Sequence, residues 1–130
     1  MSVQKAIFNL CGAVGGFDWE NGRITGWHNP TIPQPADADV NRELLKGLLE
    51  DSVQSHLDEV ARSKGYDNCL SCVSYQSSSN PVFAAEARAM TACRDAVWTK
   101  CYQVMAAVQA GTRPIPDVAQ LIFELPAIVW

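Results

Sequence analysis

The stretch FAAEARAMTACRDAVWTKCYQVMAAVQA, residues 83–110, decides the fold of this chain of 130 residues. Apolar or small side chains recur along it at alternating steps of four and three, and Arg94 is the one charged residue in the series. The apolar or small members are Phe83, Ala87, Met90, Val97, Cys101, Val104 and Val108. Such spacing places one apolar stripe along a helix, and a helix of this span is about 40 Å long. We therefore expect a long apolar helix, and the function becomes a question of what packs against it.

A further long helix is predicted upstream, from Asp37 or Asp39 as the N-cap to about Lys64, with Gly65 ending it. Its apolar side consists of Leu44, Leu45, Leu48, Leu49, Val53, Leu57 and Val60. Shorter helices are expected over 67–75 and about 116–124. Asn80 followed by Pro81 is typical of the start of a helix, so these two residues should begin the long one.

Residues 1–35 are interpreted as non-helical, because glycines recur among them up to Gly26. Within this segment, residues 17–25 predict a β-hairpin. Asn21-Gly22 suits a two-residue type I′ turn, which sets Trp19 opposite Ile24 and Glu20 opposite Arg23.

The segment from Thr31 to Pro35 is then expected to form a stiff extended connector. The expected fold is mainly α, a helical hairpin or small bundle with one long helix, preceded by an N-terminal β-hairpin arm. Residues 1–35 make the arm and connector, and residues 36–130 make the helical domain.

Composition excludes several classes of partner. The net charge is −4, the pI is near 5.0, and no run of Lys or Arg exists, so we expect no nucleic-acid partner. No apolar run approaches the roughly 20 residues that span a bilayer, so we expect no membrane partner. Residues 1–5 lack the pattern that opens a secretory signal, which favours synthesis and use in a cytoplasm.

The five cysteines are interpreted first as reduced thiols that pack as small apolar side chains. An odd number without a secretory signal argues against a secreted disulfide framework. Cys69-x-x-Cys72 lacks the second pair that a zinc site needs and the βαβ setting of a redox motif. Disulfide bonds within or between chains remain an alternative, and the candidates for them are Cys11, Cys69, Cys72, Cys93 and Cys101.

No pattern in the sequence predicts catalysis, a metal or a cofactor. Gly-x-Ser-x-Gly is absent, His56 has no second histidine at metal-binding spacing, and residues 12–16 lack the Lys-Ser/Thr of a phosphate loop. Arg94 is expected to cover apolar surface with its stem, with Asp95 facing elsewhere as a poor partner. We therefore expect a protein that is not an enzyme.

The remaining kind of function is binding through the protein surface. Aromatic side chains are favoured anchors of protein interfaces. The residues predicted to bind a partner are Trp19, Ile24, Trp27, Ile32 and Trp130.

Several segments together resemble a helical domain of uncharacterised function that occurs in small tail proteins and tail-fibre-associated proteins of tailed bacteriophages. These segments are residues 56–75, 80–87, 93–102, 108–111 and 124–126. Upstream, residues 24–27 and 33–37 resemble the short strand and proline link of phage tail-fibre assembly and small baseplate proteins. The cysteines are not part of this pattern, and a large aromatic residue more usually stands at the position of Cys93.

The resemblance implies a structural component of a phage tail, at the baseplate or at fibre attachment, which acts by protein–protein docking. Its partners would be tail-fibre or baseplate proteins, in a homo-oligomer or hetero-oligomer within the virion, after synthesis in the host cytoplasm. The alternative is a tail-fibre assembly chaperone that is absent from the mature virion. The resemblance supplies no catalytic residue.

Overall fold

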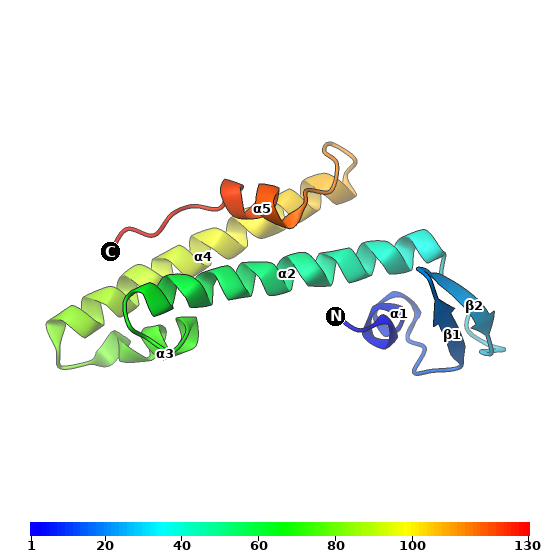
Figure 1. Cartoon of the computed structure of the whole chain (residues 1–130), viewed down its shortest axis with the longest axis horizontal. Coiled ribbons are helices and arrows are strands. Elements are labelled where there is room, and N and C mark those ends of the chain that lie inside the picture. The colour runs from blue at the N-terminus through cyan, green and yellow to red at the C-terminus, as the bar shows by residue number, and fades with distance from the viewer. The chain divides into compact units, whose positions relative to one another are not determined.

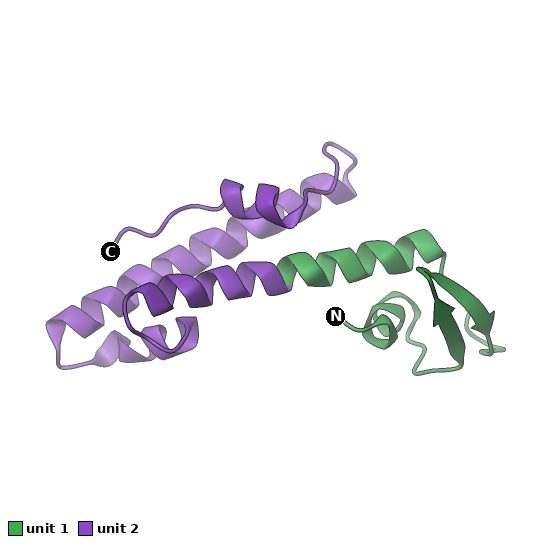
Figure 2. Cartoon of the chain, in the orientation of Figure 1, with its two compact units in different colours: residues 1–50 green, residues 51–130 purple.

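The computed structural model describes all residues from 1 to 130 and is mainly helical, with a small two-stranded antiparallel hairpin near the N-terminus (Figure 1). This confirms the predicted fold class. The chain forms two compact units, residues 1–50 and residues 51–130, and each is described by itself (Figure 2). The predicted domain division after residue 35 stays a prediction, because compactness alone does not define a domain.

The first unit begins with a helix, α1 (Val3–Cys11), so the prediction that residues 1–35 are non-helical was wrong. Ser2 caps this helix by accepting a hydrogen bond from the Lys5 N–H. Gly12 ends it in the left-handed conformation, with φ of 77°. The glycines that argue against helix all lie from residue 12 onward, and they limit α1 to its length rather than preventing it.

The hairpin has the predicted register. Strands β1 (Phe17–Glu20) and β2 (Arg23–Trp27) pair antiparallel, with Trp19 opposite Ile24 and Glu20 opposite Arg23. Asn21 and Gly22 connect them with φ values of 49° and 80°, as a type I′ turn requires. The register then shifts between Asp18 and Trp19, because Asp18 lies opposite Gly26 and β2 therefore carries one extra residue.

Helix α2 (Asp37–Ser63) confirms the predicted upstream helix. The prediction of Asp37 or Asp39 as its N-cap was wrong, because both lie in the first turn and the Asp37 carboxylate accepts from the Ile24 N–H of the hairpin. The first part of α2, up to Glu50, belongs to the first unit. There Val40 joins the buried residues Ala6, Ile7 and Ala13 in a small core. Partly buried side chains pack around this core, and they are Met1, Val3, Cys11, Phe17, Trp19, Ile24, Trp27, Ile32 and Leu44.

The second unit contains the rest of α2, then α3 (Cys69–Val73), the 3₁₀ helix η1 (Ser74–Ser77), α4 (Pro81–Gln109) and α5 (Val118–Glu124). The short helix predicted over 67–75 is thus α3 and the start of η1. Asn80 caps α4 and Pro81 opens it, both as predicted. The last helix begins at Val118, two residues later than predicted, because Asp117 is its N-cap.

The buried stripe of α4 differs from the predicted one at three places, and one of them is Val108, which is only partly buried. Ala84 is buried whereas Phe83 is 42% exposed, and Cys93 is buried where the predicted series passed through Arg94. The other buried members of the stripe are Ala87, Met90, Val97, Cys101 and Val104, all of them predicted. At positions 83–84 and 93–94, two neighbouring residues both fit the spacing of three and four along the helix. Packing against the other helices decides which of the two is buried.

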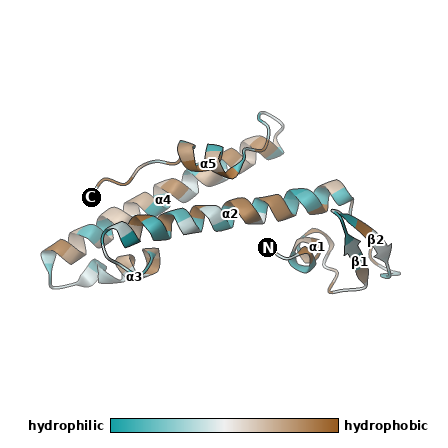
Figure 3. Ribbon diagram, in the orientation of Figure 1, coloured by the Kyte–Doolittle hydropathy of each residue, from teal (hydrophilic) through white to brown (hydrophobic).

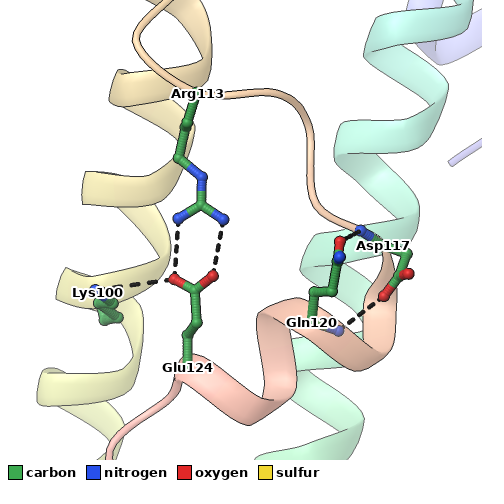
Figure 4. A network of polar contacts seen from close by, with 5 residues as sticks. All are labelled: Lys100, Arg113, Asp117, Gln120 and Glu124. Carbon is green, nitrogen blue, oxygen red and sulfur yellow. Dashed lines mark hydrogen bonds and ion pairs between the residues drawn. The ribbon is translucent and has the colours of Figure 1, made fainter.

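A polar network joins α5 to the rest of the second unit (Figure 4). The guanidinium of Arg113 donates two hydrogen bonds, of 2.9 and 2.8 Å, to the two carboxylate oxygens of Glu124. Lys100 of α4 lies 4.0 Å from the same carboxylate. At the other end of α5, Asp117 and Gln120 form a reciprocal capping box. Glu124 therefore links the end of α5 both to the loop before it and to α4.

Candidate docking surface

The residues predicted to bind a partner through the hairpin lie together in the first unit. Trp19, Ile24, Trp27 and Ile32 all pack against its small core, and all four are partly buried. The indole N–H of Trp27 donates to the Ile32 carbonyl at 2.8 Å, and its ring stacks on Phe17 with centroids 6.4 Å apart. These side chains therefore build the hairpin's own core while keeping part of their surface in solvent.

Polar contacts fix the hairpin arm to the first part of α2. Asp37 accepts a hydrogen bond of 2.8 Å from the Ile24 N–H, and the Asn41 side chain donates to the Gly22 carbonyl at 2.7 Å. Asn9 of α1 donates to Glu43 at 2.9 Å. The arm is consequently one body with residues 37–50 of the helix.

The loop between α1 and β1 is held by Asn29. Its side-chain amide donates to the carbonyls of Gly15 and Gly16, both at 2.9 Å, and the His28 N–H donates to the Gly16 carbonyl at 2.6 Å. On the exposed side of the hairpin, His28 Nε2 lies 2.9 Å from Asp18 Oδ2. The glycine-rich segment is thus a series of braced turns.

Trp130, the remaining residue predicted to bind a partner, lies in the second unit and is 41% exposed. The Lys64 ammonium nitrogen lies 5.3 Å from the centroid of its ring, within the range of a cation–π interaction. The ring is therefore held at the surface rather than buried.

Sequence reasoning missed several large apolar side chains at the surface. The most exposed are Phe123 at 91%, Val129 at 86% and Val14 at 81%. Phe123 lies on α5 and Val129 near the C-terminus. Figure 3 shows hydrophobic residues in both segments. Five of the seven residues of α5 are apolar, and Leu121, Ile122 and Phe123 are consecutive, so the sequence carried no clear signal that Leu121 would be buried and Phe123 exposed.

Two groups of aromatic rings also lie at the surface of the second unit. Tyr75 contacts both Tyr66 and Phe83, with ring centroids 5.5 and 5.6 Å apart, and burial raises the pKa of the Tyr66 phenol. On α4, Trp98 and Tyr102 lie 5.9 Å apart. Tyr75, Phe83 and Tyr102 are each at least 40% exposed, so both groups present aromatic surface to solvent.

All five cysteines are free thiols in the structure. Cys69, Cys72, Cys93 and Cys101 are buried, and Cys11 is partly buried. Burial raises the pKa of Cys69, Cys72 and Cys93, which disfavours the thiolate that attacks disulfides and binds metals. The thiols of Cys69 and Cys72 therefore have raised pKa values, as buried core cysteines do, whereas a reactive redox pair needs a lowered one.

Arg94 does not behave as predicted toward its neighbour. Its guanidinium contacts the Asp95 carboxylate at 3.0 and 3.2 Å, so the expectation that Asp95 faces elsewhere was wrong. The long arginine side chain bends along the helix surface to reach the adjacent residue. No three His, Cys, Asp or Glu residues of the chain are grouped so that they would hold a metal ion.

None of the helices combines the length and the apolar character that crossing a bilayer requires. Searches among protein families, curated proteins and solved structures found no match to this chain.

Proposed function

We propose that this chain is a structural protein that acts by docking onto other proteins, as a component of a bacteriophage tail at the baseplate or at fibre attachment. The docking role is supported by one observation above all, the two groups of aromatic rings at the surface of the second unit. Tyr66, Tyr75 and Phe83 form one group and Trp98 with Tyr102 forms the other.

Single exposed apolar residues are ordinary on soluble proteins and need no explanation, whereas contiguous exposed aromatic rings mark interaction sites. Tyrosine and tryptophan suit such sites because each offers a large apolar body and one polar atom. The hairpin residues Trp19 and Trp27 have the same character, and the hairpin that carries them is hydrogen-bonded to α2 through Ile24 and Gly22. Little conformational entropy would then be lost when a partner binds.

The phage tail as the place of action is supported by the resemblance of residues 56–75 and the segments that follow them. The acidic net charge of −4 is compatible with docking among proteins and unfavourable for binding to nucleic acid.

Mass spectrometry of purified virions of the phage that encodes the chain tests this proposal. Stoichiometric presence in the particle is the expected result. Absence from particles, combined with loss of fibres when the gene is removed, would favour the assembly chaperone. Absence combined with unaltered, fully infectious particles would refute both roles.

A pair of variants tests the docking surface itself. Tyr102→Ser removes an exposed ring from α4, and Gln103→Ser alters the neighbouring exposed residue as a matched control. We expect Tyr102→Ser to reduce incorporation into particles and Gln103→Ser to leave it unchanged. Equal incorporation of both variants would exclude the surface around Tyr102 as a docking site.

A further inference from the structure

The two outer edges of the hairpin differ in what they contact. A two-residue turn at Asn21-Gly22 makes Glu20 and Arg23 the pair that exchanges both backbone hydrogen bonds. The next pair, Trp19 and Ile24, therefore points its backbone groups outward, toward opposite edges. On the β2 edge, the outward N–H of Ile24 donates to the Asp37 carboxylate. This contact shows that the backbone N–H of Ile24 points away from β1, as the two-residue turn requires. It also shows that the start of α2 lies at the β2 edge.

The edge of β1 has no such contact. Apart from pairing with β2, the backbone groups of Phe17 and Trp19 make no hydrogen bond in the structure. The His28 N–H donates to the Gly16 carbonyl, so the backbone of Gly16 faces β2. Because the direction of the backbone groups alternates along a strand, the N–H and C=O of Phe17 point away from β2, as those of Trp19 do. Helix α1 packs against the side chains of these residues, which form one face of the hairpin. The β1 edge thus offers two N–H and two C=O groups to a further strand.

Strand β1 has only part of the protection that open edges usually carry. Proteins protect an open edge by shortness, charged side chains, proline or a bulge, and β1 is short and carries the charged Asp18 and Glu20. Residues 17–20, Phe-Asp-Trp-Glu, contain neither proline nor lysine, and the extra residue of the irregularity lies in β2.

Charge selects the occupant of this edge. Along β1 the apolar Phe17 and Trp19 alternate with the exposed Asp18 and Glu20. On the β2 side Asp18 contacts His28 and Glu20 lies opposite Arg23, so a third strand would approach these carboxylates from the other side. A second copy of β1 would place these carboxylates beside identical carboxylates, and like charges opposite each other destabilise a sheet. A strand that alternates lysine or arginine with apolar residues would place its basic side chains beside the carboxylates on one face of the sheet. Its apolar side chains would lie beside Phe17 and Trp19 on the other face.

We propose that the outer edge of β1 binds an extended segment of a partner protein as a third strand, with basic and apolar residues alternating along that segment. The inference rests on the proposed docking function and specifies how the hairpin arm carries it out. Main-chain hydrogen bonds would supply affinity, and the alternation of side chains would supply specificity.

Hydrogen exchange of backbone amides, followed by NMR on the full chain, tests this inference. The probe is a synthetic peptide of alternating lysine and valine. In the free protein the amides of Phe17 and Trp19 should exchange faster than those of Glu20 and Arg23. The peptide should slow exchange at Phe17 and Trp19 several-fold, and a version with N-methylated valines should not.

Two variants make the test sharper. Glu20→Lys should weaken binding of the lysine–valine peptide, whereas Thr25→Lys, at an exposed position of β2, should leave it unchanged. The proposal is overturned if Phe17 and Trp19 show no slowing, or if a glutamate–valine peptide slows them equally.

Slowing that rises with protein concentration and needs no peptide would identify a second copy as the occupant, and would also overturn the proposal. Because these measurements use the isolated chain, their failure would leave the virion test of the proposed function standing.

Discussion

At the scale of single residues, burial decides the chemistry of the cysteines. Cys72 is fully buried and its thiol points toward the Glu86 carbonyl, at 3.8 Å. Cys69 is also buried, and Asp58 accepts a hydrogen bond of 3.0 Å from its backbone N–H. The spacing Cys-x-x-Cys on its own is shared by metal sites, redox sites and packed helices. The structure favours the last because the raised pKa of both thiols results first from burial.

We predict that a thiolate-selective reagent labels one cysteine quickly, Cys11, and the others slowly at neutral pH. A pKa above the ordinary value means that the thiolate of Cys69, Cys72 or Cys93 forms only at more alkaline pH, and burial also blocks access. Labelling followed by peptide mass spectrometry identifies the modified residues. Denaturant should make all five react alike, and rapid labelling of Cys69 in the folded chain would contradict the prediction.

Some residue contacts were beyond sequence reasoning for a physical reason. The choice between Phe83 and Ala84, or between Cys93 and Arg94, depends on which row of the helix meets the core, and adjacent rows differ by one residue. The contact of Arg94 with Asp95 depends on side-chain torsions, on which the spacing of residues gives no information. The turn at Asn21-Gly22 was predictable because its backbone conformation is restricted to few residue types.

At the scale of elements, caps explain why most helix boundaries could be predicted. Asn80 accepts hydrogen bonds from the Val82 and Phe83 N–H groups, at 2.9 and 3.3 Å, and Pro81 occupies the first turn. The same signals were present for α1, where Ser2 and Gly12 mark the two ends. Helix α1 was not predicted because the glycines from residue 12 onward counted against a helix in the whole segment 1–35.

We predict that Asn80→Ala destabilises the folded chain by about 1 kcal/mol, the usual cost of losing an N-cap. Urea denaturation followed by circular dichroism measures this change. Asn80→Asp keeps the acceptor oxygen and should retain the stability of the original chain. A similar loss with aspartate would show that the cap hydrogen bonds are not the cause.

The contact between Arg113 and Glu124 gives α5 a pH dependence. Hydrogen bonds from Arg113 lower the pKa of the Glu124 carboxyl, and this outweighs the opposing effect of burial. In the unfolded chain the pKa of a glutamate is about 4.3. The folded pKa is lower, so the contact stabilises the fold above that value, and the stabilisation is lost as the pH falls through the folded pKa.

We predict that Arg113→Ala lowers the stability of the second unit at neutral pH and has a smaller effect in acid. Lys100 remains near Glu124 in this variant and retains part of the interaction. A double-mutant cycle with Glu124→Gln, measured by urea denaturation across the acid range, isolates the coupling between the two residues. A coupling that does not change with pH would contradict the assignment to the ionised carboxylate.

At the scale of the whole molecule, the chain is organised so that one helix contributes to two cores. The core of the first unit includes Val40 and Leu44 of α2 together with Ala6 and Ile7 of α1. In the second unit, Val53, Leu57 and Ala61 of the same helix are fully buried. The sequence predicted the continuous helix correctly, but it did not reveal that residues 37–50 depend on α1 and the hairpin for their packing.

This organisation predicts how the chain responds to removal of residues 1–35. Val40 would lose the residues that bury it, and Ile24 and Gly22 would no longer bond to Asp37 and Asn41. Short isolated helical segments are marginal in water and depend on packing for stability. We therefore expect residues 37–50 of α2 to lose protection from hydrogen exchange, while α4 keeps its protection.

Hydrogen exchange with mass spectrometry compares the truncated and full chains segment by segment. Ile7→Ser, which places a hydroxyl in the fully buried core position of α1, should reproduce the effect on residues 37–50 without shortening the chain. Phe8→Ser, at a neighbouring position that is 52% exposed, serves as the matched control and should leave protection unchanged. If α4 loses protection to the same extent as residues 37–50, the second unit depends on the first for its stability, and a shortened chain would be unsuitable for docking assays. If only residues 37–50 respond, loss of docking by the shortened chain can be attributed to the first unit.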